Sequence, residues 1–393
     1  MPRDPERPRL VAVEARPVHG DGGEARVEFR DPSGIVRSIA VLSLGGWWVA
    51  ARLDGQRTCA EIAAEARAQG SDLSPADVAR LAAELSAAGL VEGEVHDRLL
   101  RGALDAYRSG PARAPSCAGG VYPGDPAALR ALLDRHLANG AGPAHDGPVR
   151  LLVAPHIDYA RGAAGYAMAY RALAATDAEL YVVFGTAHTT PVRLFTLTRK
   201  DYATPLGAVE TDRRAVDGLA AALGEDEVLG DELAHRDEHS VELQMVWLRH
   251  VVRRPFTAIP VLCSSISHLR DPDPPTARFL GALARAIAGR RTCFVASADL
   301  AHVGPAYGDP RPPTPAELAA LADRDRRTLA FVSSGDATGF HRDATDDDAR
   351  RRLCGVAPIY AAMRASGASA RLLHYGQWTD GTDSVSFAAA AGS

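Results

Sequence analysis

The chain has 393 residues, of which 46% are hydrophobic, and its formal net charge is −5. This length suits two or three domains, and the acidic balance excludes the basic excess typical of proteins that bind duplex nucleic acid. No apolar run approaches the roughly 18 residues needed to cross a bilayer, and the charged N-terminus is not typical of a secretory signal, so we expect a cytoplasmic protein with no membrane partner.

Residues 20–98 are predicted to form a separate small domain. Two short strands flank the turn Asp31–Gly34, and a helix with Trp47, Trp48 and Leu53 follows, ended by Asp54 and Gly55. Two further helices each open with an N-capping residue: Thr58, which has the capping-box spacing to Glu61, and Ser74. The strands are expected at 25–34, 36–44 and 90–92. Strands followed by a helix–turn–helix are typical of a winged-helix α+β domain.

Residues 99–117 begin as a helix and continue into a stretch rich in Gly, Pro, Ala and Ser, which we interpret as a linker. From 118 to 393, apolar strands alternate with helices, which predicts an α/β fold: an open sheet with helices on both faces. The acidic, polar segment 336–350 is expected to be a surface loop. The predicted strands are 149–156, 179–188, 256–263, 292–302 and 370–380, and the predicted helices are 162–175, 213–223, 238–252, 276–288 and 315–334.

Three of these strands end in side chains that can bind a metal. The first ends at His156, the second at His188, and the third at Asp299 and His302. Sites in open α/β sheets form outside the carboxyl ends of the strands, so these side chains converge if the strands are neighbours. A single His at a strand end is more often structural, but three strand ends that agree favour a metal site. Further pocket candidates beside the first strand end are Asp158 and Tyr159.

Two imidazoles and one anionic ligand, with open positions, form the arrangement of non-heme iron oxygenases. His156 and His188 supply the nitrogens, whereas the anionic ligand is either Asp299 or Cys354. The five cysteines are far apart and odd in number, which indicates free thiols rather than a disulfide framework. Cys354 precedes a helix start, where the helix N-terminus and a metal would lower the pKa of its thiol. The alternative is that Cys354 is a small buried residue.

A second polar cluster lies at the start of the predicted helix 238–252. It contains His235, Glu238 and His239, and its spacing is not that of the HExxH helix of metalloproteases. One interpretation is a charged helix start, with Glu238 favourable to the helix dipole. The other is that His239 or His235 is a base beside the metal.

Seven segments of residues 118–393 follow, in order, the motifs of a known family. They are AGGVYPGDPAALRALL (118–133), APHIDYARGAAGYAMAY (154–170), FGTAH (184–188), YATPLGAVETD (202–212), AHRDEHSVELQ (234–244), SADLAHVG (297–304) and LCGVAPI (353–359). Through them this region resembles the Memo family (AmmeMemoRadiSam system protein B), whose fold is that of class III extradiol dioxygenases. Seven ordered motifs make the resemblance specific.

The resemblance implies a bound metal, iron first with copper or zinc as alternatives. Its implied ligands are His156, His188 and Cys354. Its implied catalytic residues are Asp299, His302 and His239. One departure matters, because Asp158 stands where many members have Gly, and this leaves the ligand set and the substrate open. The dioxygenases use a carboxylate where the Memo family has the Cys, so ring-cleavage chemistry does not transfer.

The front domain resembles the PqqD-like peptide-recognition winged helix. The resemblance rests on Leu53–Thr58, on Glu61 and Ile62, and on the stretch 85–91. It implies that a peptide partner binds as an added strand at a sheet edge. A winged helix that only mediates dimerisation is the alternative. DNA binding is disfavoured, because the second helix of the pair, 76–90, has one Arg and no Lys.

Together these features predict a metal-dependent redox or oxygen-using enzyme that acts on a peptide or a small molecule. The alternative is a non-catalytic peptide-binding or adaptor protein that uses the same pocket. The family resemblance also implies radical SAM and AMMECR1-like partner proteins.

Overall fold

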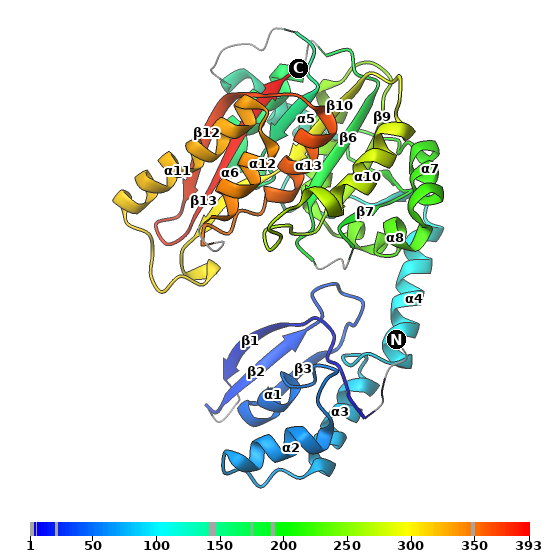
Figure 1. Ribbon diagram of the computed structural model, residues 1–393, viewed down its shortest axis with the longest axis vertical. Coiled ribbons are helices and arrows are strands. Elements are labelled where there is room, and N and C mark those ends of the chain that lie inside the picture. Colours follow the sequence, from blue (N-terminus) through cyan, green and yellow to red (C-terminus); the bar gives the residue numbers. More distant parts are fainter. Residues whose placement is uncertain are drawn as a thin grey trace. The chain divides into compact units, whose positions relative to one another are not determined.

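The computed structural model of the chain describes residues 4, 6–19, 23–140, 147–173, 176–189, 193–346 and 350–393. The chain divides into two compact units, Met1–Ser109 (unit 1) and Gly110–Ser393 (unit 2). The division falls within the residues predicted to be the linker, at the end of the helix α4 (Glu94–Ser109). Figure 1 shows the elements of both units, coloured along the sequence.

Unit 1 is built on an antiparallel sheet in the order β1-β2-β3, with helices packed around Phe29 in one core. Both capping boxes are present, at Thr58 and at Ser74, as the sequence predicts. In place of a strand at 90–92, Val91 forms an isolated bridge with Leu10. The further elements are β1 (Glu14–His19), β2 (Ala25–Arg30), β3 (Ile39–Ser43), α1 (Leu44–Ala50), α2 (Cys59–Ala68) and α3 (Pro75–Ala87).

The described residues of unit 2 form an eight-stranded mixed sheet in the order β11-β13-β5-β10-β6-β9-β7, with β12 paired to β13. The central strands β5, β10, β6 and β9 are parallel, and the strands outside them are antiparallel to their neighbours. The strands of this sheet are β5 (Leu151–Ala154), β6 (Leu180–Thr186), β7 (Phe195–Leu197), β9 (Thr257–Cys263), β10 (Thr292–Ser297), β11 (Asp299–Val303), β12 (Arg371–Thr379) and β13 (Ser384–Gly392). A separate parallel pair consists of β4 (Ala112–Arg113) and β8 (Asp201–Tyr202).

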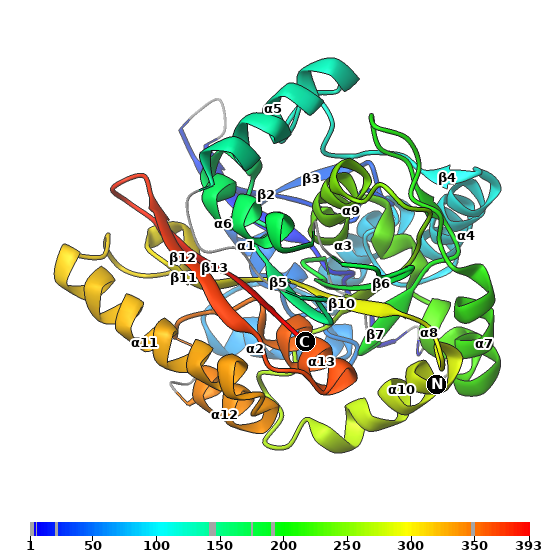
Figure 2. The same cartoon turned by 90° about the horizontal axis from the view of Figure 1, so that it is seen from above.

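Helices cover both faces of the large sheet, which confirms the predicted α/β architecture. The helices of unit 2 are α5 (Pro126–Asn139), α6 (Tyr159–Ala172), α7 (Arg213–Leu223), α8 (Glu225–Leu229), η2 (Glu232–Arg236), α9 (His239–Val251), α10 (Asp273–Ala286), η3 (Pro305–Tyr307), α11 (Pro315–Ser334), α12 (Ala337–Thr345) and α13 (Val356–Ser366). Figure 2 shows α5, α6 and α9 on one face and α10, α12 and α13 on the other. Because strand side chains alternate between faces, Leu152 packs in the first layer and Leu151 in the second.

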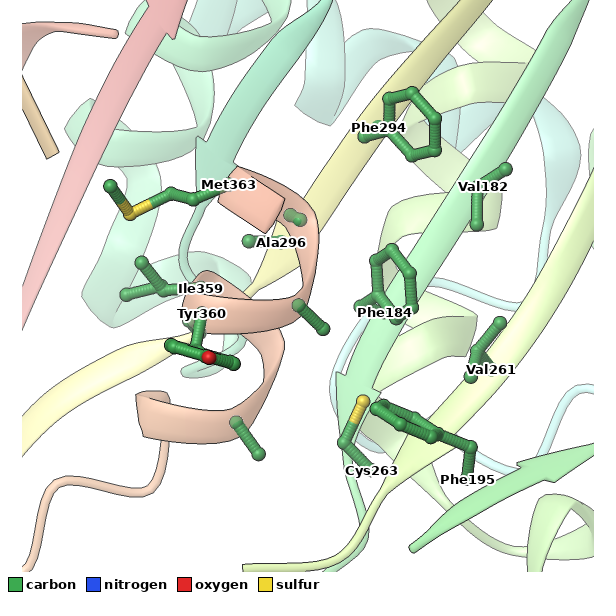
Figure 3. Packing of buried hydrophobic residues seen from close by; sticks show 14 of the residues in the cluster. Val182, Phe184, Phe195, Val261, Cys263, Phe294, Ala296, Ile359, Tyr360 and Met363 are labelled. Carbon is green, nitrogen blue, oxygen red and sulfur yellow. The ribbon is translucent and has the colours of Figure 1, made fainter. Parts of the chain in front are cut away.

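The larger core lies between the sheet and α13. Figure 3 shows Ile359 and Met363 of α13 beside Ala296 of β10, with Phe184 of β6 and Val261 of β9 further along the same layer. Burying each large apolar side chain stabilises the fold by roughly 1.5–3 kcal/mol. This packing fixes the start of α13 and therefore the loop that carries Cys354.

The structure differs from the sequence prediction at segment 336–350, where α12 replaces the expected loop. Asp336 caps this helix by accepting a hydrogen bond from the backbone N–H of Gly339 at 2.8 Å, and Phe340 and Ala344 are buried against the core. The segment is mostly polar, and only one apolar stripe of the helix faces the core. Its overall composition therefore suggested a loop instead of a helix. Residues 347–349 of the segment lie outside the described part of the chain.

The predicted strand 292–302 is two strands, because the chain leaves β10 after Ser297 and continues in β11, which pairs with β13. Strand β13 was not among the strands expected from the sequence, although every one of its residues is buried. Its run of small residues lacks the bulky β-branched pattern by which strands are recognised. Among the described helices, none combines the length and the apolar character needed to cross a membrane.

Candidate metal centre

The carboxyl ends of β5, β10 and β6 lie side by side at one edge of the sheet. Ser297, the last residue of β10, pairs with Ala154 of β5 on one side and with Gly185 of β6 on the other. His156 lies two residues beyond β5, and His188 lies two residues beyond β6. The expectation that these strand ends are neighbours is confirmed, and it explains why side chains from distant segments meet.

Three imidazoles form one compact group at this edge. His156, His188 and His239 each place one ring nitrogen within 4.8 Å of the others. The rings of His188 and His239 are stacked with centroids 4.6 Å apart, and His156 meets His188 edge-on with centroids 5.0 Å apart. His239 is the first residue of α9, and its ring belongs to this group.

One buried carboxylate holds two of these rings. Oε1 of Glu238 lies 3.0 Å from Nδ1 of His188 and 3.1 Å from Nδ1 of His239, and Oε2 accepts the backbone N–H of His188 at 2.8 Å. Burial opposes the charged form of Glu238, but the hydrogen bonds from both imidazoles outweigh it and hold its pKa well below the usual value. Because a carboxylate only accepts, both Nδ1 atoms carry protons, and in the neutral rings the lone pair is on Nε2.

His156 has the same tautomer for a different reason. Its Nδ1 lies 3.1 Å from the carbonyl oxygen of Ser297, which can only accept, so the lone pair is again on Nε2. That Nε2 lies 3.2 Å from Sγ of Cys354 and 3.6 Å from Oδ2 of Asp299. Burial, reinforced by the charges of the neighbouring imidazoles, keeps the pKa of His156 well below the usual value. The ring is therefore neutral, as a metal ligand must be.

Cys354 lies in the loop directly before α13. The backbone N–H of Gly355 donates to the carbonyl oxygen of Asp299 at 3.0 Å, and a Cβ at position 355 would collide with that oxygen. Thr186 Oγ1 donates to the carbonyl oxygen of Cys354 at 3.0 Å. The start of α13 was expected to lower the pKa of the Cys354 thiol, and this expectation is wrong. Burial, and then the charge of Asp299, raise the pKa of the thiol well above its usual value.

A cavity of about 440 Å³ opens over this group. The predicted site residues that line it are His156, His188, His239, Asp158, Asp299 and His302. Burial raises the pKa of Asp299 to about 6, against the opposing backbone N–H groups of His156 and Ile157. Burial lowers the pKa of His302, whose Nδ1 lies 3.0 Å from the carbonyl oxygen of Leu300.

Three of the four predicted pocket residues, Tyr159, His235 and Glu238, do not line the cavity, and neither does the predicted ligand Cys354. The hydroxyl of Tyr159 donates to the carbonyl oxygen of Leu243 at 2.7 Å. His235 is fully buried, with Nδ1 2.7 Å from the hydroxyl of Tyr202 and Nε2 2.9 Å from the carbonyl oxygen of Thr196. Burial lowers the pKa of His235 to about 4. Both side chains are thus structural, and Glu238 lies behind the imidazoles that it orients rather than on the cavity wall.

The sequence analysis missed Arg161 and Tyr307, which also line the cavity. Arg161 lies three residues after Asp158, the N-cap of α6, and its Nε is 2.8 Å from Oδ2 of that carboxylate. The opposite charges of Asp158 and Arg161, three residues apart on a predicted helix, could have indicated this contact from the sequence. The ring of Tyr307 meets that of His302 edge-on, 5.1 Å between centroids, and nothing in its sequence context distinguished it.

Comparison with known proteins places the chain in a family. The family model described as Memo-like protein matches residues 113–392. The chain belongs to the Memo-like family. The first unit of this Memo-like chain lies before the match.

Relatives in archaea support the assignment. A MEMO1 family protein of Methanopyrus kandleri is 31% identical over 280 residues, covering 67% of this chain and 91% of the relative. A MEMO1 family protein of Methanosarcina barkeri is 30% identical over 230 residues, covering 57% and 77%. One of Archaeoglobus fulgidus is 29% identical over 274 residues, covering 69% and 94%.

The donor set of this Memo-like chain fits a transition metal. Ligating imidazoles usually donate the other ring N–H to a carboxylate or a backbone carbonyl, and His156, His188 and His239 all have this arrangement. Metal–nitrogen bonds of about 2.0 Å and metal–sulfur bonds of about 2.3 Å place neighbouring donor atoms roughly 3 to 4 Å apart. The 3.2 Å between Nε2 of His156 and Sγ of Cys354 agrees with a shared cation, but Cys354 does not belong to the group of donor atoms that all lie within 4.8 Å of one another.

Proposed function

We propose that this Memo-like chain is a metal-dependent oxidoreductase with its cation at the carboxyl edge of the sheet. The observation that carries the proposal is the common tautomer of three converging imidazoles: each has Nδ1 held by a protein oxygen and therefore has its lone pair on Nε2. His156 and His188 are the first two ligands. Iron is the first candidate because two imidazoles and an anionic donor with open positions suit it, with copper or zinc as alternatives.

A bound iron would supply redox and oxygen chemistry that side chains lack. The protein's own groups bind the substrate and move protons. His239, oriented by Glu238, can accept a proton at Nε2 when it is not itself a ligand. His302 lies on the wall of the same cavity and is a second candidate proton donor or acceptor.

Two residues compete for the third ligand position, and a matched pair of variants separates them. His239 belongs to the compact imidazole group, whereas Sγ of Cys354 reaches the group at His156. We expect Cys354→Ser to lose most of the bound iron, because a thiolate supplies the anionic charge that three imidazoles lack. His239→Ala should keep iron but lose turnover.

The measurement is metal per chain after anaerobic reconstitution with Fe(II), Zn(II) and Cu(I). About one equivalent of one of these metals is expected for the wild type. Full occupancy in Cys354→Ser with loss in His239→Ala would instead assign the third ligand to His239. A wild-type chain that stays metal-free with all three ions would overturn the proposed function.

A second candidate function, peptide binding by unit 1, has its own supporting observation. Strand β3 is at the edge of its sheet, and Ile39 and Val41 on it are 58% and 45% exposed. Exposed edges with apolar side chains invite pairing with another strand. We therefore propose that a peptide adds to β3. Radical SAM and AMMECR1-like proteins, which the family resemblance implies, are proposed as further partners of the chain.

A charge on this edge should abolish peptide capture. We expect Val41→Lys in the full chain to lose the peptides that co-purify with the wild type and are identified by mass spectrometry, because lysine on an edge strand opposes pairing. The matched control is Leu99→Lys, which also places a charge on an exposed apolar residue of unit 1 but lies on α4. Equal peptide capture by Val41→Lys and the wild type would contradict the proposal.

A further inference from the structure

Arg161 is fixed at the metal cavity by two contacts on different parts of its guanidinium. Its Nε lies 2.8 Å from Oδ2 of Asp158, and its central carbon lies 3.9 Å above the centroid of the Trp378 ring. The other oxygen of Asp158 accepts the backbone N–H of Arg161 at 2.9 Å. Because Asp158 also caps α6, the positive end of the helix dipole balances part of its charge.

These contacts leave one binding edge of the guanidinium unused. A guanidinium offers two forks of N–H groups, one that includes Nε and one formed by the two Nη atoms. Asp158 occupies the Nε side, and within the described residues the Nη atoms of Arg161 have no hydrogen-bond or ion-pair partner. The side chain is 45% exposed, so this fork is accessible. An Arg that is already held flat on an aromatic ring loses little freedom when it binds a planar anion.

The rest of the cavity wall is largely apolar. Besides its imidazoles and carboxylates, the cavity is lined by Val121, Ile157, Leu243, Val385 and Tyr307. Its volume of about 440 Å³ is in the range of sites for small molecules. Apolar walls with few polar groups bury the body of a ligand, while the polar groups fix its orientation.

We propose that Arg161 determines the specificity of this cavity and that the substrate is a small molecule with a carboxylate on an apolar body. The Nη fork of Arg161 binds the carboxylate, and the apolar walls hold the body beside the imidazole group. Trp378 and Asp158 are positioning residues that keep the guanidinium in place. The inference rests on the proposed function, since it names the substrate class of the same site.

The test compares 3-phenylpropanoate with 3-phenylpropanamide, which has the same shape and no charge, by calorimetric titration of the metal-reconstituted full chain. We expect the acid to bind roughly 10- to 100-fold tighter than the amide, the range for hydrogen bonds to charged groups. Arg161→Gln should reduce that ratio to about one, and Arg161→Lys should fall between, because lysine keeps the charge without the fork. The matched control is Arg214→Gln, which removes an exposed Arg on α7 and should change nothing.

Three results would overturn the inference: equal binding of acid and amide by the wild type, no binding of the acid at millimolar concentration, or an undiminished preference in Arg161→Gln. The last would place the carboxylate on the cation. Metal content is measured on each sample before titration, so failure of the metal site is seen separately. The same titrations of a metal-free chain still report on Arg161, and circular dichroism checks that each variant is folded.

Discussion

His156→Ala should bind the cognate metal more than about 100-fold more weakly than the wild type. Loss of groups that only orient a ligand costs roughly 10- to 100-fold in metal affinity, and His156 is proposed as a ligand itself. Its Nε2 lies 3.2 Å from Sγ of Cys354 and 3.6 Å from Oδ2 of Asp299, where the proposed donor atoms meet. Metal per chain after anaerobic reconstitution, followed by competition with a chelator, measures the effect.

The matched control for this prediction is His302→Ala. His302 lines the same cavity but lies outside the compact imidazole group, so its removal should leave metal content unchanged while it lowers turnover. Each variant removes one imidazole from the same cavity. A difference in metal content between the two variants therefore reports on metal binding and not on a general loss of structure. Full metal occupancy in His156→Ala would contradict the assignment of the ligand.

The convergence of His156, His188 and Asp299 could be predicted because it depends on one general property of parallel sheets. Each residue follows an apolar run, and adjacent parallel strands end at the same edge. The strand order could not be predicted from the sequence. Any order that makes β5, β10 and β6 neighbours, however, brings these three side chains together at the same edge of the sheet. This is why the fold class and the location of the site followed from local patterns.

Residues whose roles depend on tertiary contacts could not be predicted in the same way. The role of Arg161 requires the ring of Trp378, which arrives on β12 from a distant part of the chain. His235 has the same side chain as His239 and lies four residues before it, yet Tyr202 and the backbone of Thr196 enclose it. Spacing along one helix start does not reveal which of two imidazoles faces a cavity and which faces the core.

A buried ion pair joins the first residues of the family match to the helix that carries His239. Glu242 and Arg113 are both fully buried, and Nη1 of Arg113 donates to Oε2 of Glu242. The same carboxylate accepts the backbone N–H groups of Ser116 and Cys117, each at 3.0 Å, and the hydroxyl of Tyr122. Arg113 also donates to the carbonyl oxygens that precede α9, those of His235 at 2.8 Å and Glu238 at 2.9 Å.

Glu242→Ala should therefore lower the free energy of unfolding of unit 2 by about 3–5 kcal/mol, because it leaves the charge of Arg113 buried without its partner. Urea denaturation followed by circular dichroism measures the change. Glu227→Ala, which removes an exposed carboxylate in the first turn of α8, is the matched control and should stay within about 0.5 kcal/mol of the wild type.

The double variant Arg113→Met with Glu242→Leu tests why the single variants lose stability. The cause is either the lost attraction between the two charges or the charge that stays buried without a partner. Replacing both partners by apolar side chains removes the buried charges together, so the double variant should lose less stability than the sum of the two single variants. If instead the two losses add, the carboxylate acts mainly through its hydrogen bonds to the 116–122 segment, and the ion pair contributes little to holding α9 beneath the imidazole group.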